Sequence, residues 1–437
     1  MKNSKLMNFF KKLFKLLYLK LLLLTNGLFI MTSEIMILTP NAIALATDSA
    51  ITLDNKKSYN GVNKLFMLSN NPPMGIMTYN TARLFNIPFE TIIKEFRKDI
   101  NDKNLTQTID FKNEFEEYLH KIPPKSPYKY SFDEKIKDFI EIISNEYDSF
   151  GKNEFFNRLN NLMLPQDLIQ IVHDSIKSEY IENAKKEFIN LCAQFDYLNK
   201  QEEFIQFILN RFFFDMFVKS YTGVVLCGFD EDNLFPLGFS FKIFYLYDDK
   251  FICGNLEEYN LFNSNFGVIV EAFAQDDVIK TFLTGIDDVI NFHIQNFFKE
   301  INNNYTDELV NLIDSNENID ENSKKEVFAE INKFNVKNQI LPIKFNNLIE
   351  ELIGNNLFPI YKSIGALPFD ELSNLCESLI KVTSLKRKVQ SDLETVGGDV
   401  DVAIITKGDG FIWTKRKHYF DGDLNPQFFD RKKDKKV

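Results

Sequence analysis

The chain has 437 residues, of which 44% are hydrophobic, and a formal net charge of −11 at neutral pH. This length suits one large domain with insertions or two domains, and the apolar content is enough to bury a core. The acidic balance argues against a nucleic-acid-binding surface. The four cysteines form no CxxC pair and the four histidines have no zinc spacing, so we expect reduced thiols and no metal site or Ser-His-Asp mechanism.

The first 31 residues differ in composition from the rest of the chain. Residues 1–30 contain six lysines, no acidic residue and an interrupted apolar run. They fit a signal or anchor segment, a basic helix on a membrane surface, a removed propeptide, or upstream sequence read in frame. The run is short for a spanning helix. We favour translation from Met31, which makes residues 1–31 absent from the mature chain and the protein cytoplasmic. Membrane association through residues 1–30 is the alternative.

A strand–turn–strand pattern follows directly. Two apolar runs, residues 35–38 and 42–46, are separated by a Pro-Asn turn. Thr32 lies just before the first run, Asp48 ends the second, and Lys64 opens a third apolar run. The spacing from Thr32 to Asp48 and from Asp48 to Lys64 is 16 residues in each case. Singly, each residue is better explained as a strand threonine, a turn aspartate or a surface lysine.

Together, these residues and their spacing resemble the start of proteasome β-subunits and of the peptidase ring of bacterial ATP-dependent proteases. These are N-terminal-nucleophile (Ntn) hydrolases. The resemblance implies that Thr32 is the nucleophile and that its own α-amine is the base. It also implies that Lys64 favours the neutral amine and that Asp48 holds Lys64. Removal of Met31 would expose the threonine amine.

The resemblance extends to the next apolar segment, residues 73–82. Gly75 matches the family glycine whose backbone N–H helps to form the oxyanion hole, although a plain strand glycine is an equal interpretation. A second family glycine is not kept. Pro73, Met77 and Thr78 are candidates for a substrate pocket, and core packing explains them as well.

Two helical segments exceed what the family usually has. Apolar residues recur at helical spacing over about 83–218 and again over 278–388, and a strand pattern returns between them at 222–253. We therefore expect an α+β protein in which residues 32–437 form a single domain. The resemblance implies a four-layer αββα sandwich with two large helical insertions.

The C-terminal segment carries the last part of the resemblance. Asp392 and Thr395 keep a family spacing before a glycine pair and a strand, which implies hydrogen bonds around the nucleophile's amine. Capping of a helix-to-strand turn is the alternative. The family's supporting serine is missing, and Gln275 or Asp276 is the candidate replacement. Asp276 and Asp277 are equally good helix N-cap and first-turn residues.

These observations leave two functions open. The first is a threonine-nucleophile amidohydrolase, most simply a peptidase, that acts on peptides or amides without metal or cofactor. It is expected to form homo-oligomers and to work with an unfoldase or other protein partner, and not with nucleic acid. The second is a catalytically silent scaffold or binding protein on the same fold, because fold alone does not decide function.

Overall fold

The computed structural model describes residues 32–53, 57–84, 87–122, 182, 185–186, 189, 209, 221–245, 251–264, 266–316, 319–320, 322–329, 340–390, 397–418 and 420–427. The leader segment, Asp392 and Thr395 lie outside the described residues, as does most of the first predicted insertion after residue 122. The expectations for these parts stay predictions.

The first sheet contains the two strands predicted around the Pro-Asn turn. Its five strands are antiparallel in the order β12-β1-β2-β13-β14. Their bounds are β1 (Ser33–Leu38), β2 (Ile43–Thr47), β12 (Ile269–Ala274), β13 (Asp401–Thr406) and β14 (Gly410–Lys415). Every residue of β1, β2 and β13 is buried, as expected for a strand covered on both faces. Segments from both ends of the chain therefore build one sheet.

The second sheet is also antiparallel, in the order β11-β10-β9-β6-β5. Its strands are β5 (Leu65–Asn70), β6 (Pro73–Asn80), β9 (Tyr221–Phe229), β10 (Pro236–Tyr245) and β11 (Phe251–Asn260). Two short ribbons stand apart from it: β3 (Ala50–Leu53) with β4 (Lys57–Asn60), and β7 (Arg83–Leu84) with β8 (Ile87–Pro88).

The two sheets pack face to face. A Cβ added at Gly75 in β6 would lie 2.9 Å from Ile405 of β13 and 3.1 Å from Leu45 of β2. Met36 of β1 similarly lies 3.2 Å from the place of a Cβ on Gly238 of β10. Large side chains of one sheet thus fill the space left by glycines of the other, which gives the close packing that protein interiors require.

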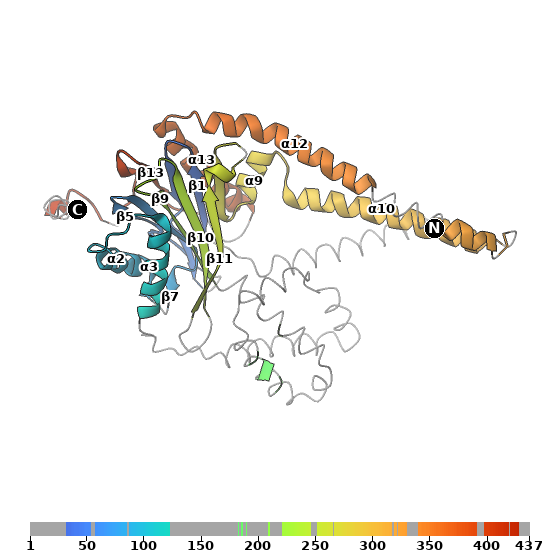
Figure 1. The fold of residues 1–437 in the computed structure, drawn as a ribbon, viewed down its shortest axis with the longest axis horizontal. Coiled ribbons are helices and arrows are strands. Elements are labelled where there is room, and N and C mark those ends of the chain that lie inside the picture. The colour runs from blue at the N-terminus through green and yellow to red at the C-terminus, as the bar shows by residue number, and fades with distance from the viewer. Residues whose placement is uncertain are drawn as a thin grey trace.

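Helices cover the outer face of each sheet (Figure 1). α2 (Phe89–Asp99) and α3 (Thr108–Lys121) pack on the second sheet, and their Phe96 and Phe115 rings meet with centroids 5.0 Å apart. α9 (Asp277–Thr284), α12 (Ile340–Ile364) and α13 (Phe369–Gln390) cover the first sheet. The long helix α10 (Asp288–Asp314) extends away from the sheets in Figure 1.

The expected α+β class with antiparallel sheets is confirmed. In the described part of the first predicted insertion up to residue 122, the helices α2 and α3 bury aromatic side chains against the second sheet, so this part belongs to the core of the domain. Among the described residues, none of the helices has the length and hydrophobicity to cross a membrane.

Candidate functional site

Asp48 is the most heavily bonded side chain of the site. It directly follows β2, is 1% exposed, and accepts four hydrogen bonds. Its Oδ1 accepts from Ser33 N at 3.3 Å and from Lys64 Nζ at 2.5 Å. Its Oδ2 accepts from Ala50 N at 3.3 Å and from Gly397 N at 3.2 Å. One carboxylate therefore ties the first strands to the C-terminal segment, 349 residues further along the chain.

Lys64 lies just before β5, so its side chain reaches from the second sheet to the end of the first. It is 3% exposed, and its backbone oxygen accepts a hydrogen bond from Thr78 N at 2.9 Å. The structure thus brings together the Asp48 and Lys64 that the spacing singled out. A buried lysine needs such a partner because an isolated buried ammonium is costly.

Glu34 is a third member of this buried group, and the sequence reasoning did not identify it. It is fully buried in β1, with Oε1 at 3.6 Å from Lys64 Nζ. Burial raises the pKa of Glu34 to about 8, with Lys64 lowering it, Asp48 raising it and the Thr32 hydroxyl lowering it. The sequence contains one signal that could have identified Glu34. It is a glutamate in an otherwise apolar strand, two residues from Thr32 and therefore on the same face of the strand.

The carboxyl groups of Asp48 and Glu34 both lie beside the Lys64 ammonium, and Asp48 is much the closer of the two. Burial raises the pKa of Asp48 as well, while Lys64 and the backbone N–H groups oppose this shift. In contrast, neither Glu34 oxygen lies within hydrogen-bond distance and angle of a donor among the described residues, and Lys64 Nζ is 3.6 Å away. We therefore assign the proton to Glu34 at neutral pH and the charge to Asp48, because two carboxylates beside one lysine cannot both ionise cheaply.

Buried polar groups without partners gather on these first strands. Besides the two Glu34 oxygens, the hydroxyls of Ser33, Thr47 and Ser49 have no partner among the described residues. Thr47 lies opposite Glu34 in the β1–β2 register. Unsatisfied buried groups are rare in native proteins, and Ser33 and Ser49 flank the Asp48–Lys64 pair through the Ser33 N–H and the chain next to Asp48.

Thr32 directly precedes β1, on the same face of the strand as Glu34, and is 2% exposed. Its Oγ1 accepts a hydrogen bond of 3.1 Å from Asn80 N, and its backbone oxygen accepts one of 3.2 Å from Gln275 N. Asn80 has φ +69°, a left-handed conformation that asparagine tolerates better than most residues. Its side chain donates to Tyr221 O at 2.8 Å, which fixes the N–H direction.

Gly75 lies elsewhere. It is five residues before Asn80 on an extended strand, hence roughly 16 Å away, and it faces apolar side chains between the sheets. The N–H beside the Thr32 hydroxyl belongs to Asn80 instead. The glycine is needed at position 75 because a side chain there would meet Ile405 at 2.9 Å.

The three predicted pocket residues are not brought together. Pro73 begins β6 and Thr78 lies near its other end. Met77 and Thr78 are neighbours in a strand, so their side chains point to opposite faces of the sheet. Both are buried, and core packing is the better interpretation of all three.

The residues expected to replace the missing serine are engaged with helices. Gln275 Oε1 accepts from Arg387 Nε of α13 at 2.5 Å. Asp276 pairs with Lys280 one turn later at 2.5 Å, and Asp277 pairs with Arg387 and with Lys386 at 2.9 Å. The backbone N–H of Gln275 donates a hydrogen bond to the backbone oxygen of Thr32.

A cavity of about 280 Å³ reaches Asp48 from the side of α13. Its lining includes Leu385 of α13 and the Gly397–Gly398 segment. Gly398 has φ +75°, and a Cβ there would lie 2.3 Å from the Ser49 hydroxyl. The glycine allows the C-terminal segment to approach Asp48 closely.

No protein-family model matches the chain, and no match was found among the curated proteins. Among solved structures, it is similar to Anbu (ancestral beta-subunit) from Yersinia bercovieri, with 8% sequence identity and a TM-score of 0.31. The similarity covers 92% of this chain and 94% of that one. A TM-score this low does not establish a shared fold.

Proposed function

We propose that this protein is a threonine-nucleophile amidohydrolase built as a four-layer αββα Ntn sandwich, with Thr32 as the nucleophile. The observation that carries the proposal is the position of the Thr32 hydroxyl. It accepts a hydrogen bond from the Asn80 backbone N–H and lies on the same strand face as Glu34, which contacts Lys64. A hydroxyl, an N–H donor and a buried lysine–carboxylate group are the parts that acyl transfer needs.

In the proposed reaction, the Thr32 Oγ1 attacks the carbonyl carbon of an amide. The hydroxyl is a weak nucleophile and needs a base. When the chain begins at Thr32, its α-amine is that base, with an ordinary pKa of about 7.7–8.0. The amine accepts the hydroxyl proton and then donates it to the leaving nitrogen, and water subsequently hydrolyses the ester formed on Thr32.

The Asn80 N–H is the proposed oxyanion donor in place of Gly75. It is held rigidly by the left-handed backbone at Asn80 and by the bond to Tyr221. When the Thr32 hydroxyl oxygen bonds to the carbonyl carbon of the substrate, the carbonyl oxygen becomes negatively charged. The Asn80 N–H is within reach of this carbonyl oxygen. One such donor contributes about 3–4 kcal/mol to transition-state stabilisation in acyl transfer.

Lys64 and its two carboxyl partners set the charge around the amine. With Asp48 ionised and Glu34 protonated, the group is neutral overall and Lys64 keeps its positive charge. A nearby cation disfavours protonation of an amine, so Lys64 would keep the Thr32 amine available as a base. Asp48 holds Lys64 in place through the 2.5 Å contact.

One observation favours the second candidate, a catalytically silent scaffold or binding protein. Thr32 is only 2% exposed, whereas a peptide or other amide substrate must reach its hydroxyl. The proposal also includes homo-oligomers and an unfoldase or other protein partner. These two features rest only on the sequence resemblance.

The test compares two threonines of the same β1–β2 segment. The chain is produced from Met31, and hydrolysis of fluorogenic peptide amides and acylation by a β-lactone are measured for the natural protein, Thr32→Ala and Thr39→Ala. Thr39 is buried in the turn after β1, where it bonds Ala42. We expect Thr32→Ala alone to abolish both signals. A folded protein that begins at Thr32 and gives neither signal would instead support the silent scaffold.

A further inference from the structure

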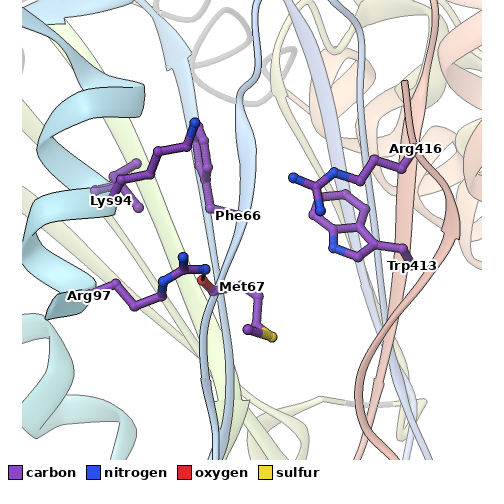
Figure 2. A pocket seen from close by; sticks show the side chains of 7 residues that line it. Phe66, Met67, Lys94, Arg97, Trp413 and Arg416 are labelled. Atoms are coloured by element: carbon purple, nitrogen blue, oxygen red, sulfur yellow. Dashed lines mark hydrogen bonds between the residues drawn. The ribbon is translucent and has the colours of Figure 1, made fainter. Parts of the chain in front are cut away.

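A second cavity lies where the edge strands of the two sheets, in the described part of the chain, meet helix α2. The strands β5 and β14 are the last strands of their sheets on this side, and a cavity of about 190 Å³ lies between them and α2. Figure 2 shows Lys94 and Arg97 on one side of it and Trp413 and Arg416 on the other. Phe66 and Met67 of β5 lie between the two sides and give the pocket an apolar floor.

The positive charges of this pocket are only partly neutralised. Lys94 pairs with Glu90, which also accepts a hydrogen bond of 3.0 Å from Asn63. Among the described residues, the hydrogen bond found for Arg97 goes to a carbonyl oxygen, that of Met67 at 3.5 Å. None of the described residues that line the cavity is acidic. This cationic surface therefore stands out on a chain whose net charge is −11.

Arg416 is held over an aromatic face rather than by a carboxylate. Its guanidinium lies 4.5 Å from the centroid of the Trp413 ring, a cation–π contact that orients the group without using its N–H donors. Burial lowers the pKa of Arg416, the charges of Asp401 and Glu90 oppose this shift, and the charge of Arg97 adds to it. Asp401 is itself bonded by Lys417. An anion between Arg97 and Arg416 would relieve their mutual repulsion.

We propose that this pocket binds a small oxyanion, a phosphate or a carboxylate, between Arg97 and Arg416. Guanidinium groups match the planar, paired acceptors of both anions. The apolar group that carries the anion would lie on Trp413 and Phe66. The cavity of about 190 Å³ has room for an oxyanion with a few attached carbon atoms. None of the proposed catalytic residues lines this pocket, so the inference is independent of the proposed function.

The chain has one tryptophan, Trp413, so its fluorescence reports on this pocket alone. The experiment titrates the whole protein with sodium phosphate and, separately, with sodium acetate. Sodium chloride keeps the ionic strength constant, because general screening would otherwise mimic binding. We expect a saturable change in Trp413 emission with at least one of the two anions. Saturation at lower phosphate than acetate identifies a phosphate ligand, and the reverse order identifies a carboxylate.

Three variants separate binding at the pocket from a general charge effect. Arg97→Ala and Arg416→Ala should each weaken binding about tenfold or more, since a hydrogen bond to a charged group is lost. Lys98→Ala removes a cation from the same helix, where Lys98 pairs with Glu95 and is 72% exposed, and should leave binding unchanged. Far-UV circular dichroism checks that each variant is folded. Absence of saturation with both anions, or equal affinities in Arg97→Ala, Lys98→Ala and the natural protein, would overturn the inference.

Discussion

The backbone N–H of Asn80 donates a 3.1 Å hydrogen bond to the hydroxyl oxygen of Thr32, 48 residues earlier in the chain. This bond joins the last residue of β6 in the second sheet to the residue just before β1 in the first. It places a rigid donor beside the proposed nucleophile. The junction between the two sheets is therefore also the proposed reaction centre.

The first prediction concerns the backbone at Asn80. Alanine is strained at φ +69°, whereas glycine adopts this conformation readily. Both substitutions remove the side-chain bond to Tyr221. We expect Asn80→Ala to lower the free energy of unfolding by about 1 kcal/mol more than Asn80→Gly, measured by urea denaturation. Equal losses in the two variants would mean that the left-handed backbone is not maintained at this position.

The second prediction tests the buried ion pair. Asp48→Asn leaves the buried Lys64 without its main counterion, which typically costs about 3–5 kcal/mol. Glu34, which lies 3.6 Å from Lys64, can ionise and partly replace the lost charge. We therefore expect the free energy of unfolding to fall by about 3 kcal/mol, the lower end of this range. The same chemical change at the hairpin residue Asp409 is the control, with an expected loss below about 1 kcal/mol. Similar losses at both positions would contradict the assigned ion pair.

A double variant sharpens this test. Lys64→Met combined with Asp48→Asn removes the uncompensated charge and fills part of the same space. We expect the double variant to be more stable than the sum of the two single losses implies, because residues in contact do not behave additively. Strict additivity would show that the two side chains do not interact.

The third prediction is a pH dependence caused by Glu34. Its pKa is about 8 in the folded protein against an ordinary value of 4.5. Between these pH values the folded state binds one proton more than the unfolded state, so stability falls as pH rises. The slope is at most about 1.4 kcal/mol per pH unit.

Glu34→Gln removes this titration while keeping the size of the side chain. Between about pH 5.5 and 7.5, the free energy of unfolding of the natural protein should fall by up to about 2–3 kcal/mol more than that of the Gln variant. Urea unfolding at both pH values measures the difference. Parallel pH profiles for the two proteins would show that Glu34 is not held in its protonated form.

The fourth prediction concerns the packing that supports Asn80. A Cβ on Gly223 of β9 would lie 1.9 Å from the Tyr79 ring, so Gly223→Ala should cost about 2–3 kcal/mol through overpacking. Gly354→Ala is the control, because nothing lies within 4 Å of that position in α12 and alanine favours a helix. Thermal unfolding should separate the two variants clearly. An unchanged melting temperature for Gly223→Ala would mean that the Tyr79 ring is not fixed there.

Much of the first sheet and part of the site could be predicted from the sequence. The apolar runs around the Pro-Asn turn became β1 and β2. These features are local, because short apolar runs form strands and a turn reverses the chain. The contact between Asp48 and Lys64 was implied by the family resemblance and not by a local pattern. Helical spacing also predicted helices within residues 278–388, where α9, α10, α12 and α13 lie, but it did not predict that α10 continues unbroken through the polar residues 302–304.

Glu34 and Asn80 could not be assigned in the same way. Glu34 is significant because it is buried beside a lysine 30 residues away, and burial is a property of the whole fold. The position of Asn80 beside Thr32 depends on how the two sheets pack, which no local pattern encodes. The choice of Gly75 as the oxyanion donor relied on a matching residue type, and the geometry instead favours Asn80.

The most direct test of the proposed hydrolase is the N-terminal residue of the mature protein. Intact-mass measurement and N-terminal sequencing of protein made from its native start region would determine it. A chain that begins at Thr32 is the predicted result, because only then does the nucleophile carry a free α-amine. A chain that retains Met1 or Met31 would contradict the mechanism and leave the silent scaffold as the better account.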